Sequence, residues 1–207
     1  MKSRLLVLRH AQTAVPDRFH GAESDIGLGD LGLEQARNVA DRIAMIEPKA
    51  IYSSAMRRAR ETAQPIASAC GLPSTSIAAL HERKMGPLSG TPWVESYPIY
   101  EETMRRWMSG DLDATHAGGE SYAQIRSRVV PEFLAIAARH AEETVVVVAH
   151  GVVIRVLITS LVDGLGPEDL RLVPIEFVGI HDLRCDGALW SLVVESADGP
   201  AGSSDEK

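Results

Sequence analysis

The chain has 207 residues, of which 45% are hydrophobic and 24% are charged, and its formal net charge is −7. This composition is typical of a globular protein, and the length favours one domain with a sizeable core. The acidic balance disfavours nucleic acid as a partner, because most nucleic-acid-binding proteins present a basic surface. Cys70 and Cys185 lie far apart and outside CxxC spacing, so we expect no disulfide framework and a reducing compartment.

The ends of the chain carry no strong targeting pattern. The basic N-terminus leads into a short apolar run at 5–8, which is shorter than the core of a signal peptide. No run approaches the length that crosses a bilayer. We therefore expect a cytoplasmic protein with no membrane partner. Residues 197–207 are small, polar and charged, and we expect a disordered tail there.

Apolar patterning predicts alternating strands and helices along the chain. In order, we expect a strand at 5–8, a loop at 14–30, a helix at 31–46, a strand at 50–53, a helix that ends at Gly71, a helix at 122–140, a strand at 144–149, a buried helix at 152–162, and a strand pair at 177–183 and 188–194. Ser54 stands where its hydroxyl would cap the second helix.

Residues 72–120 are less regular and hold the aromatic residues Trp93, Tyr97, Tyr100 and Trp107. We expect an insertion with short helices at about 81–120, within a single domain at 1–196. Strands that alternate with helices predict a three-layer α/β/α sandwich with a mostly parallel central sheet. In such sheets, ligands bind outside the carboxyl ends of the strands.

Three of the predicted strands end in polar residues. Arg9 and His10 follow the first strand, Ser53 and Ser54 end the second, and His150 follows the strand "TVVVVA". Carboxyl ends of parallel strands meet at one edge of a sheet, so these side chains are expected to lie on one rim.

The residue types on this rim favour a phosphorylated substrate. Arginine presents a planar fork of donors that matches phosphate oxygens, and a helix start offers free N–H groups. A neutral imidazole can attack as a nucleophile when its other nitrogen is held by a hydrogen bond. A leaving alkoxide would need a proton from a carboxylic acid. By position alone, both Glu82 and Glu120 are candidates for that acid.

Six segments resemble, in order, the sequence blocks of the histidine phosphatase superfamily, also called the phosphoglycerate-mutase-like family. The segments are "RHAQT", "SDIGLGDLGLEQA", "IYSSAMRRARETA", "LHERKMGPLSG", "GGESYAQIRSRV" and "VVVVAHGVVIRVL". The resemblance covers nearly the whole chain. The resemblance implies the fold of that family and an enzyme that transfers a phosphoryl group.

The resemblance also implies roles for individual residues. His10 would be the nucleophile that becomes phosphohistidine, and Glu82 would be the proton donor. The remaining residues of the phosphate and substrate site would be Arg9, Gln12, Arg58, His150 and the backbone at Gly151. The implied reaction uses no metal and no cofactor. The implied partner is a small-molecule phosphate ester, and a homodimer is left open.

The chain departs from the family pattern at four positions. Ala11 replaces the glycine of the RHG signature, and Pro16 stands where many members have a phosphate-contacting asparagine. Gly29 replaces a helix-capping threonine, and Ser89 replaces the second glutamate of the Glu82 block. These departures leave the identity of the substrate open.

The sequence is compatible with three functions. The first is a phosphomonoesterase, and the second is a phosphoglycerate mutase, which returns the phosphoryl group to a sugar acid. Cofactor-dependent mutases of the family are usually longer than 207 residues, so length favours the phosphatase. The third is a non-catalytic module that binds phosphorylated ligands. Replacement of His10 by alanine separates an enzyme from a binding module.

Overall fold

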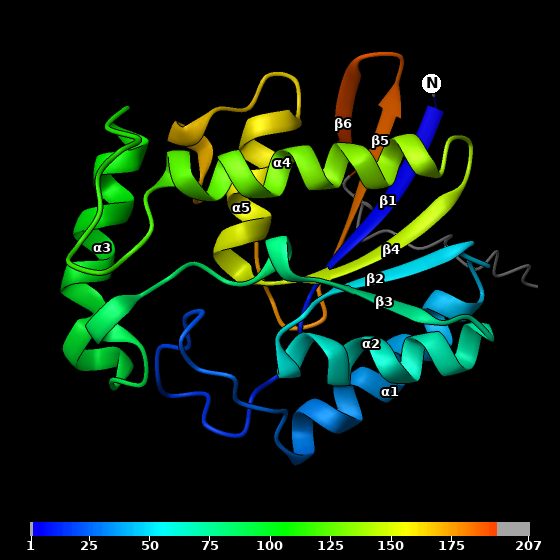
Figure 1. Ribbon diagram of the computed structural model, residues 1–207, viewed down its shortest axis with the longest axis horizontal. Helices are drawn as coiled ribbons and strands as arrows, with labels where there is room; N and C mark the ends of the chain where they lie inside the picture. The colour runs from blue at the N-terminus through cyan, green and yellow to red at the C-terminus, as the bar shows by residue number, and fades with distance from the viewer. Residues whose placement is uncertain (1, 194–207) are drawn as a thin grey trace, which may run out of the picture.

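The computed structural model describes residues 2–193, so the predicted tail at 197–207 lies outside the described residues. A six-stranded sheet runs through the centre in the order β3-β2-β4-β1-β5-β6 (Figure 1). Its strands are β1 (Lys2–Arg9), β2 (Ala50–Ser54), β3 (Ser74–Ile77), β4 (Thr144–Ala149), β5 (Ile180–Asp186) and β6 (Leu189–Val193). The first four run parallel, whereas β5 lies antiparallel to β1 and pairs with β6.

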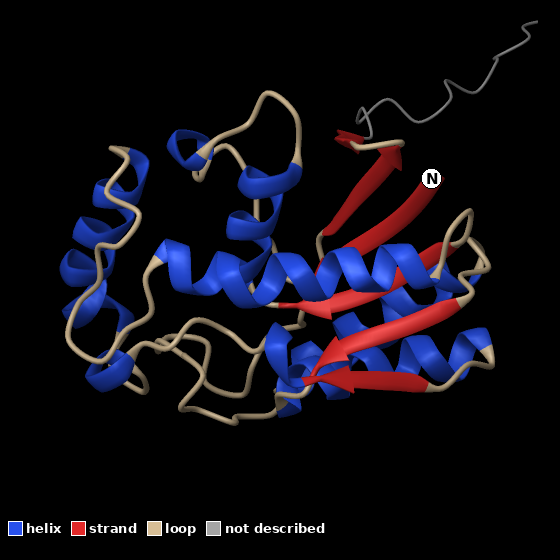
Figure 2. Cartoon of the chain, turned by 45° about the horizontal axis from the view of Figure 1, so that its top comes forward, coloured by secondary structure: helices blue, strands red, loops and turns tan. Residues whose placement is uncertain are grey.

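Helices cover both faces of this sheet (Figure 2). On one face α1 (Asp30–Ala44) and α2 (Arg57–Cys70) pack against Leu6, Leu8 and Val146. The opposite face carries α4 (Tyr122–Arg139) and α5 (Gly151–Leu161), which pack against Leu5, Val7 and Val145. Strands that are covered on both faces are continuous apolar runs, as in β1 and β4. The predicted α/β/α sandwich is confirmed.

The region between α2 and α4 differs from the prediction. It begins with β3, an edge strand that was not predicted, because "STSI" lacks an apolar alternation. A 16-residue helix, α3 (Trp93–Met108), follows in place of several short helices. Pro98 lies inside α3, and a proline within such a pattern argues for a break. Within residues 2–193, the 3-10 turns are Ala78–Leu80, Gly86–Leu88 and Pro167–Asp169.

Two local predictions were wrong. Ser54 belongs to β2, and its hydroxyl accepts a hydrogen bond from the Met56 N–H (3.2 Å), while α2 begins later and has no side-chain cap at its N-cap residue, Met56. The last strand pair begins at Ile180 rather than at 177. The reason is Val178, whose φ of 53° leaves the extended region.

The parallel order places three strand ends beside one another. Strand β4 lies between β2 and β1, and Arg9 of β1 is in register with Ala149 of β4. The residues that follow, His10 and His150, therefore leave the sheet at the same edge. Within residues 2–193, none of the helices has the length and hydropathy needed to span a bilayer.

Candidate active site

A cavity of about 130 Å³ opens at this edge of the sheet. It is smaller than the several hundred Å³ of a site for a drug-sized ligand, which indicates a small ligand. Its lining includes four of the predicted site residues, Arg9, His10, Glu82 and Gly151. Arg58 and His150 are fully buried next to it, and the His10 and His150 ring centroids are 5.2 Å apart.

The His10 ring is held in one tautomer. Its Nδ1 lies 2.7 Å from the carbonyl oxygen of Ala11. Because a carbonyl oxygen can only accept, Nδ1 carries the proton and Nε2 keeps a free lone pair. Burial, Arg58 and Arg9 hold the pKa of His10 well below its usual value. The imidazole is therefore neutral at physiological pH, as a nucleophile must be.

Two arginines place positive charge beside this ring. Arg9 donates from Nη1 to the Ile175 carbonyl (2.6 Å), and its guanidinium carbon lies 4.1 Å from the centroid of Phe177. Arg58 is 0% exposed and donates to the carbonyls of Ser24 (2.8 Å) and His20 (3.1 Å). These contacts fix both guanidinium groups but supply no counter-charge.

The start of α5 adds further donors. His150 is its N-cap, and Gly151 and Val152 line the cavity. The first N–H groups of a helix have no intrahelical partner and carry partial positive charge. Burial, Arg58 and His10 hold the pKa of His150 well below its usual value, so this imidazole is neutral as well.

Five buried side-chain polar atoms in residues 2–193 have no hydrogen-bond partner. They are Arg9 Nε, Arg58 Nε, Arg83 Nη1 and both ring nitrogens of His150. Buried polar groups are almost always hydrogen-bonded, so a cluster of unpaired ones needs an explanation. Four of these five atoms belong to the predicted phosphate site. An anion with several acceptor oxygens would satisfy them.

The structure separates the two candidate acids. Glu82 lines the cavity together with His10, and its Oε1 accepts from the Arg83 backbone N–H at 2.8 Å. Glu120 is outside the cavity lining and pairs with Arg128 (Nε to Oε1, 2.9 Å). Of the two, only Glu82 is placed to reach a ligand beside His10.

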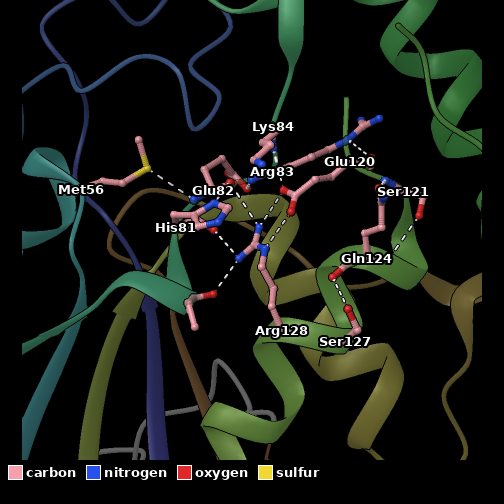
Figure 3. A network of polar contacts seen from close by, with 11 residues as sticks. Met56, His81, Glu82, Arg83, Lys84, Glu120, Ser121, Gln124, Ser127 and Arg128 are labelled. Atoms are coloured by element: carbon pink, nitrogen blue, oxygen red, sulfur yellow. Dashed lines mark hydrogen bonds and ion pairs between the residues drawn. The ribbon is translucent and has the colours of Figure 1, made fainter. Parts of the chain in front are cut away.

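Arg128 joins α4 to the segment that carries Glu82 (Figure 3). It donates to the carbonyls of Ala79 (2.7 Å), His81 (2.9 Å) and Glu82 (3.3 Å), and to both carboxylate oxygens of Glu120. One guanidinium thus ties a long helix to the 3-10 turn Ala78–Leu80 and to the two residues that follow it. This network sets the position of the Glu82 backbone.

Comparison with known proteins identifies the family of this site. The sequence profile of the histidine phosphatase superfamily (branch 1) matches residues 5–197. The chain belongs to the histidine phosphatase superfamily.

Relatives in the superfamily include both phosphatases and mutases. The chain is 32% identical over 195 residues to a metal-independent phosphoserine phosphatase of Arabidopsis thaliana, covering 91% of this chain and 81% of that one. It is 34% identical to a 2,3-bisphosphoglycerate-dependent phosphoglycerate mutase of Brucella ovis, covering 95% and 100%.

Solved structures agree with this family. A mycobacterial glucosyl-3-phosphoglycerate phosphatase superposes with a TM-score of 0.82 at 26% identity, covering 94% of this chain and 98% of that one. A phosphoserine phosphatase variant of Entamoeba histolytica superposes with a TM-score of 0.80 at 25% identity, covering 93% and 95%. The prediction of a histidine phosphatase is confirmed.

Several residues to which the resemblance assigned no role also line the cavity. They are Thr13, Pro16, Arg18, Phe19, His20, Arg83, Met85, Trp93, Tyr100, Val152, Ile175 and Phe177. The aromatic members come from distant parts of the chain, so no sequence spacing connects them. Gln12 and His81 lie outside the lining.

The departures from the superfamily pattern have different consequences. Ala11 is buried and is not among the residues with positive φ, so its methyl group fits. Pro16 lines the cavity, whereas Ser89 accepts from the Gly21 N–H (3.3 Å) away from it. Gly29 leaves the start of α1 without a side-chain cap. Within residues 2–193, no three His, Cys, Asp or Glu side chains converge as metal ligands.

Proposed function

We propose that the protein is a metal-independent phosphomonoesterase that hydrolyses a small-molecule phosphate ester through a phosphohistidine on His10. One observation carries the assignment of His10. A neutral imidazole, whose Nδ1–H donates to the Ala11 carbonyl, lies against a cavity and beside Arg9 and Arg58, which form no ion pair within residues 2–193. This is what transfer of an anionic group to nitrogen requires.

In the first step, His10 Nε2 attacks the phosphorus atom. A P–N bond forms as the bond from phosphorus to the ester oxygen breaks. The proton on Nδ1 stays there and continues to be donated to the Ala11 carbonyl. Arg9, Arg58 and the α5 N-terminus stabilise the negative charge on the three equatorial oxygens. Glu82 donates its proton to the leaving alkoxide, which departs as a neutral alcohol.

In the second step, water takes the place of the alcohol. Glu82, now a carboxylate, accepts a proton from the water as its oxygen attacks the phosphorus atom. The P–N bond breaks, inorganic phosphate leaves, and both His10 and Glu82 return to their first states. The same residues thus serve both halves of the reaction.

A phosphoglycerate mutase would use the same first step. The Brucella ovis mutase is covered over 100% of its length, so chain length does not separate the two functions. Phosphoserine and phosphoglycerate derivatives appear in the names of the relatives and belong in the first substrate panel. The single-domain organisation, the cytoplasmic location and the homodimer stay predictions.

The deciding experiment measures phosphate release from a panel of phosphomonoesters without added metal. The wild type should release phosphate, and His10→Ala should lose at least about a thousandfold in rate, because the nucleophile is gone. His140→Ala is a matched control, since this histidine bonds Tyr52 and Glu143 instead. It should retain turnover.

The same samples report on the alternatives. Conversion of 3-phosphoglycerate to 2-phosphoglycerate, stimulated by 2,3-bisphosphoglycerate and without net phosphate release, would identify a mutase. Phosphate esters that bind with unchanged affinity to both proteins, with no turnover by either, would identify a binding module. Full turnover by His10→Ala would refute the phosphohistidine.

A further inference from the structure

The fifth unpartnered buried atom, Arg83 Nη1, is not explained by the phosphate site. Arg83 is 0% exposed, follows Glu82 in sequence and lines the same cavity. The rest of its guanidinium is occupied. Nε donates to the Glu120 carbonyl (2.9 Å), Nη2 lies 3.3 Å from His116 Nδ1, and the guanidinium carbon is 4.6 Å from the Trp107 ring centroid.

No carboxylate in residues 2–193 forms an ion pair with Arg83. The two nearest are occupied by other donors. Glu82 accepts from the Arg83 backbone, and the Glu120 carboxylate binds Arg128 and the Lys84 N–H. The His116 Nε2–H donates to the Met85 carbonyl (3.0 Å), so its Nδ1 is a neutral acceptor.

A buried guanidinium without a counter-ion is costly, and proteins retain one where a ligand supplies the charge. Burial lowers the pKa of Arg83 to about 10, which still leaves the group charged at neutral pH. Arg9 and Arg58, in the phosphate site, likewise each have a buried guanidinium nitrogen without a hydrogen-bond partner. Arg83 therefore marks a second position for negative charge in one cavity.

Tyr100 lines the same cavity as Arg83 and is near enough for the charges of the two groups to interact. It is buried, lines the cavity, and its hydroxyl makes no hydrogen bond within the described part of the chain. Burial raises the pKa of Tyr100 above its usual value, so the hydroxyl keeps its proton. One cation and one hydroxyl match the single charge and two oxygens of a carboxylate. A second phosphate would bring more charge, and among the arginines of residues 2–193 that line the cavity only Arg83 has an unpartnered buried donor outside the phosphate site.

We infer that Arg83 and Tyr100 bind a carboxylate on the alcohol part of the substrate. The substrate class is then a phosphorylated hydroxy acid or amino acid. The phosphoryl group would lie against His10, and the acid group would lie beyond Glu82. This inference rests on the proposed phosphatase activity. It makes Arg83 a residue that determines specificity rather than one that carries the reaction.

Matched pairs of esters test the inference. Phosphoserine differs from phosphoethanolamine by the carboxylate, and 3-phosphoglycerate differs from glycerol 3-phosphate in the same way. For at least one pair, kcat/KM of the wild type should be about tenfold or more higher for the ester with the carboxylate, because an ester without it leaves buried donors unpaired. The ratio of these two kcat/KM values measures the preference. Arg83→Met keeps the stem but removes the donors, and should bring the ratio close to one.

Controls separate recognition from folding and from general charge. Tyr100→Phe removes one hydroxyl and should lower the ratio by several-fold, so the test does not depend on Arg83→Met alone. Arg18→Met removes a cavity-lining charge whose Nη1 donates to the Gly90 carbonyl. It should keep the ratio. If Arg83 had only a structural role, Arg83→Met would lower kcat/KM for both esters of a pair by the same factor.

Failure of this inference is distinguishable from failure of the proposed function. Hydrolysis of both members of each pair at equal efficiency would overturn the carboxylate site and leave the phosphatase intact. A ratio that Arg83→Met and Tyr100→Phe both leave unchanged would do the same. Preference for 2,3-bisphosphoglycerate over 3-phosphoglycerate, lost in Arg83→Met, would assign the position to a second phosphate and overturn the carboxylate.

Discussion

Single side chains in the cavity keep or lose their charge according to burial and to their neighbours. Burial and two adjacent guanidinium groups hold the pKa of His10 well below its usual value. Arg83 stays charged, with a pKa of about 10, although it is as deeply buried. The same environment therefore holds a neutral imidazole beside charged guanidinium groups, as the proposed reaction requires.

Glu82→Gln tests the proposed role of Glu82 as the proton donor. Loss of the proton should slow the first step with an alkyl phosphate by roughly 10²–10⁴-fold. The loss should be much smaller with p-nitrophenyl phosphate, whose leaving group departs without protonation. Single-turnover release of the alcohol measures this step. Glu102→Gln, which removes an exposed carboxylate paired with Arg105, is the control and should affect both esters equally. A loss that is equal for both esters in Glu82→Gln would exclude Glu82 as the donor.

Among the elements, the contact between α4 and the 79–82 segment has the most direct consequence for the site. This segment consists of the end of the 3-10 turn Ala78–Leu80 and the two residues after it, and Arg128 binds three of its carbonyls (Figure 3). The Arg128–Glu120 pair that anchors this guanidinium is mostly buried. Removing one member of such a pair leaves the other charge uncompensated.

Arg128→Met should lower the free energy of unfolding by roughly 3 kcal/mol, because Glu120 is left without its cation. It should also slow the first step more with alkyl phosphates than with p-nitrophenyl phosphate, since Glu82 loses its fixed position. Urea denaturation and single-turnover kinetics measure the two effects. Arg139→Met, on the same helix, removes only a contact with Tyr52. An unchanged leaving-group ratio in Arg128→Met would limit Arg128 to stability.

For the whole molecule, the buried histidines govern stability in mildly acidic solution. The pKa values of His10 and His150 lie well below 6.5 in the fold, mainly because both rings are buried. Below pH 6.5 the unfolded chain binds protons that the folded chain does not. Acidification from pH 6.5 therefore destabilises the fold. Each such histidine contributes up to about 1.4 kcal/mol per pH unit.

Urea denaturation at pH 7.5, 6.0 and 5.0 should show this loss, before the carboxylates with lowered pKa values begin to contribute. Among these are Glu61, Glu120 and Asp182, whose pKa values lie below their usual range. His150→Gln removes one of the two groups and should reduce the slope of stability against pH over this window. A stability that is flat from pH 7.5 to 5.0 would contradict the buried neutral pair.

The differences between sequence and structure come from contacts that local patterns do not encode. The helix face of α4 was predicted correctly, and its members Tyr122, Ile125 and Phe133 are buried, because a 3.6-residue period is a local property. Strand β3 was missed because its four residues pair at an edge without an apolar signal. The prediction that Ser54 caps α2 was wrong, because the position of a hydroxyl in the sequence does not by itself show where a helix begins.

The apolar patterning along the chain was enough to predict the α/β/α sandwich and a rim with Arg9, His10 and His150. The six family motifs, which occur in the order of the family, were enough to predict the family. Strand direction makes that rim, since parallel neighbours end at one edge. Only the tertiary structure distinguished Glu82 from Glu120 on geometry and brought Arg83 and Tyr100 to the same cavity. Burial and the absence of a partner depend on distant segments that fold together, and no spacing along a chain records them.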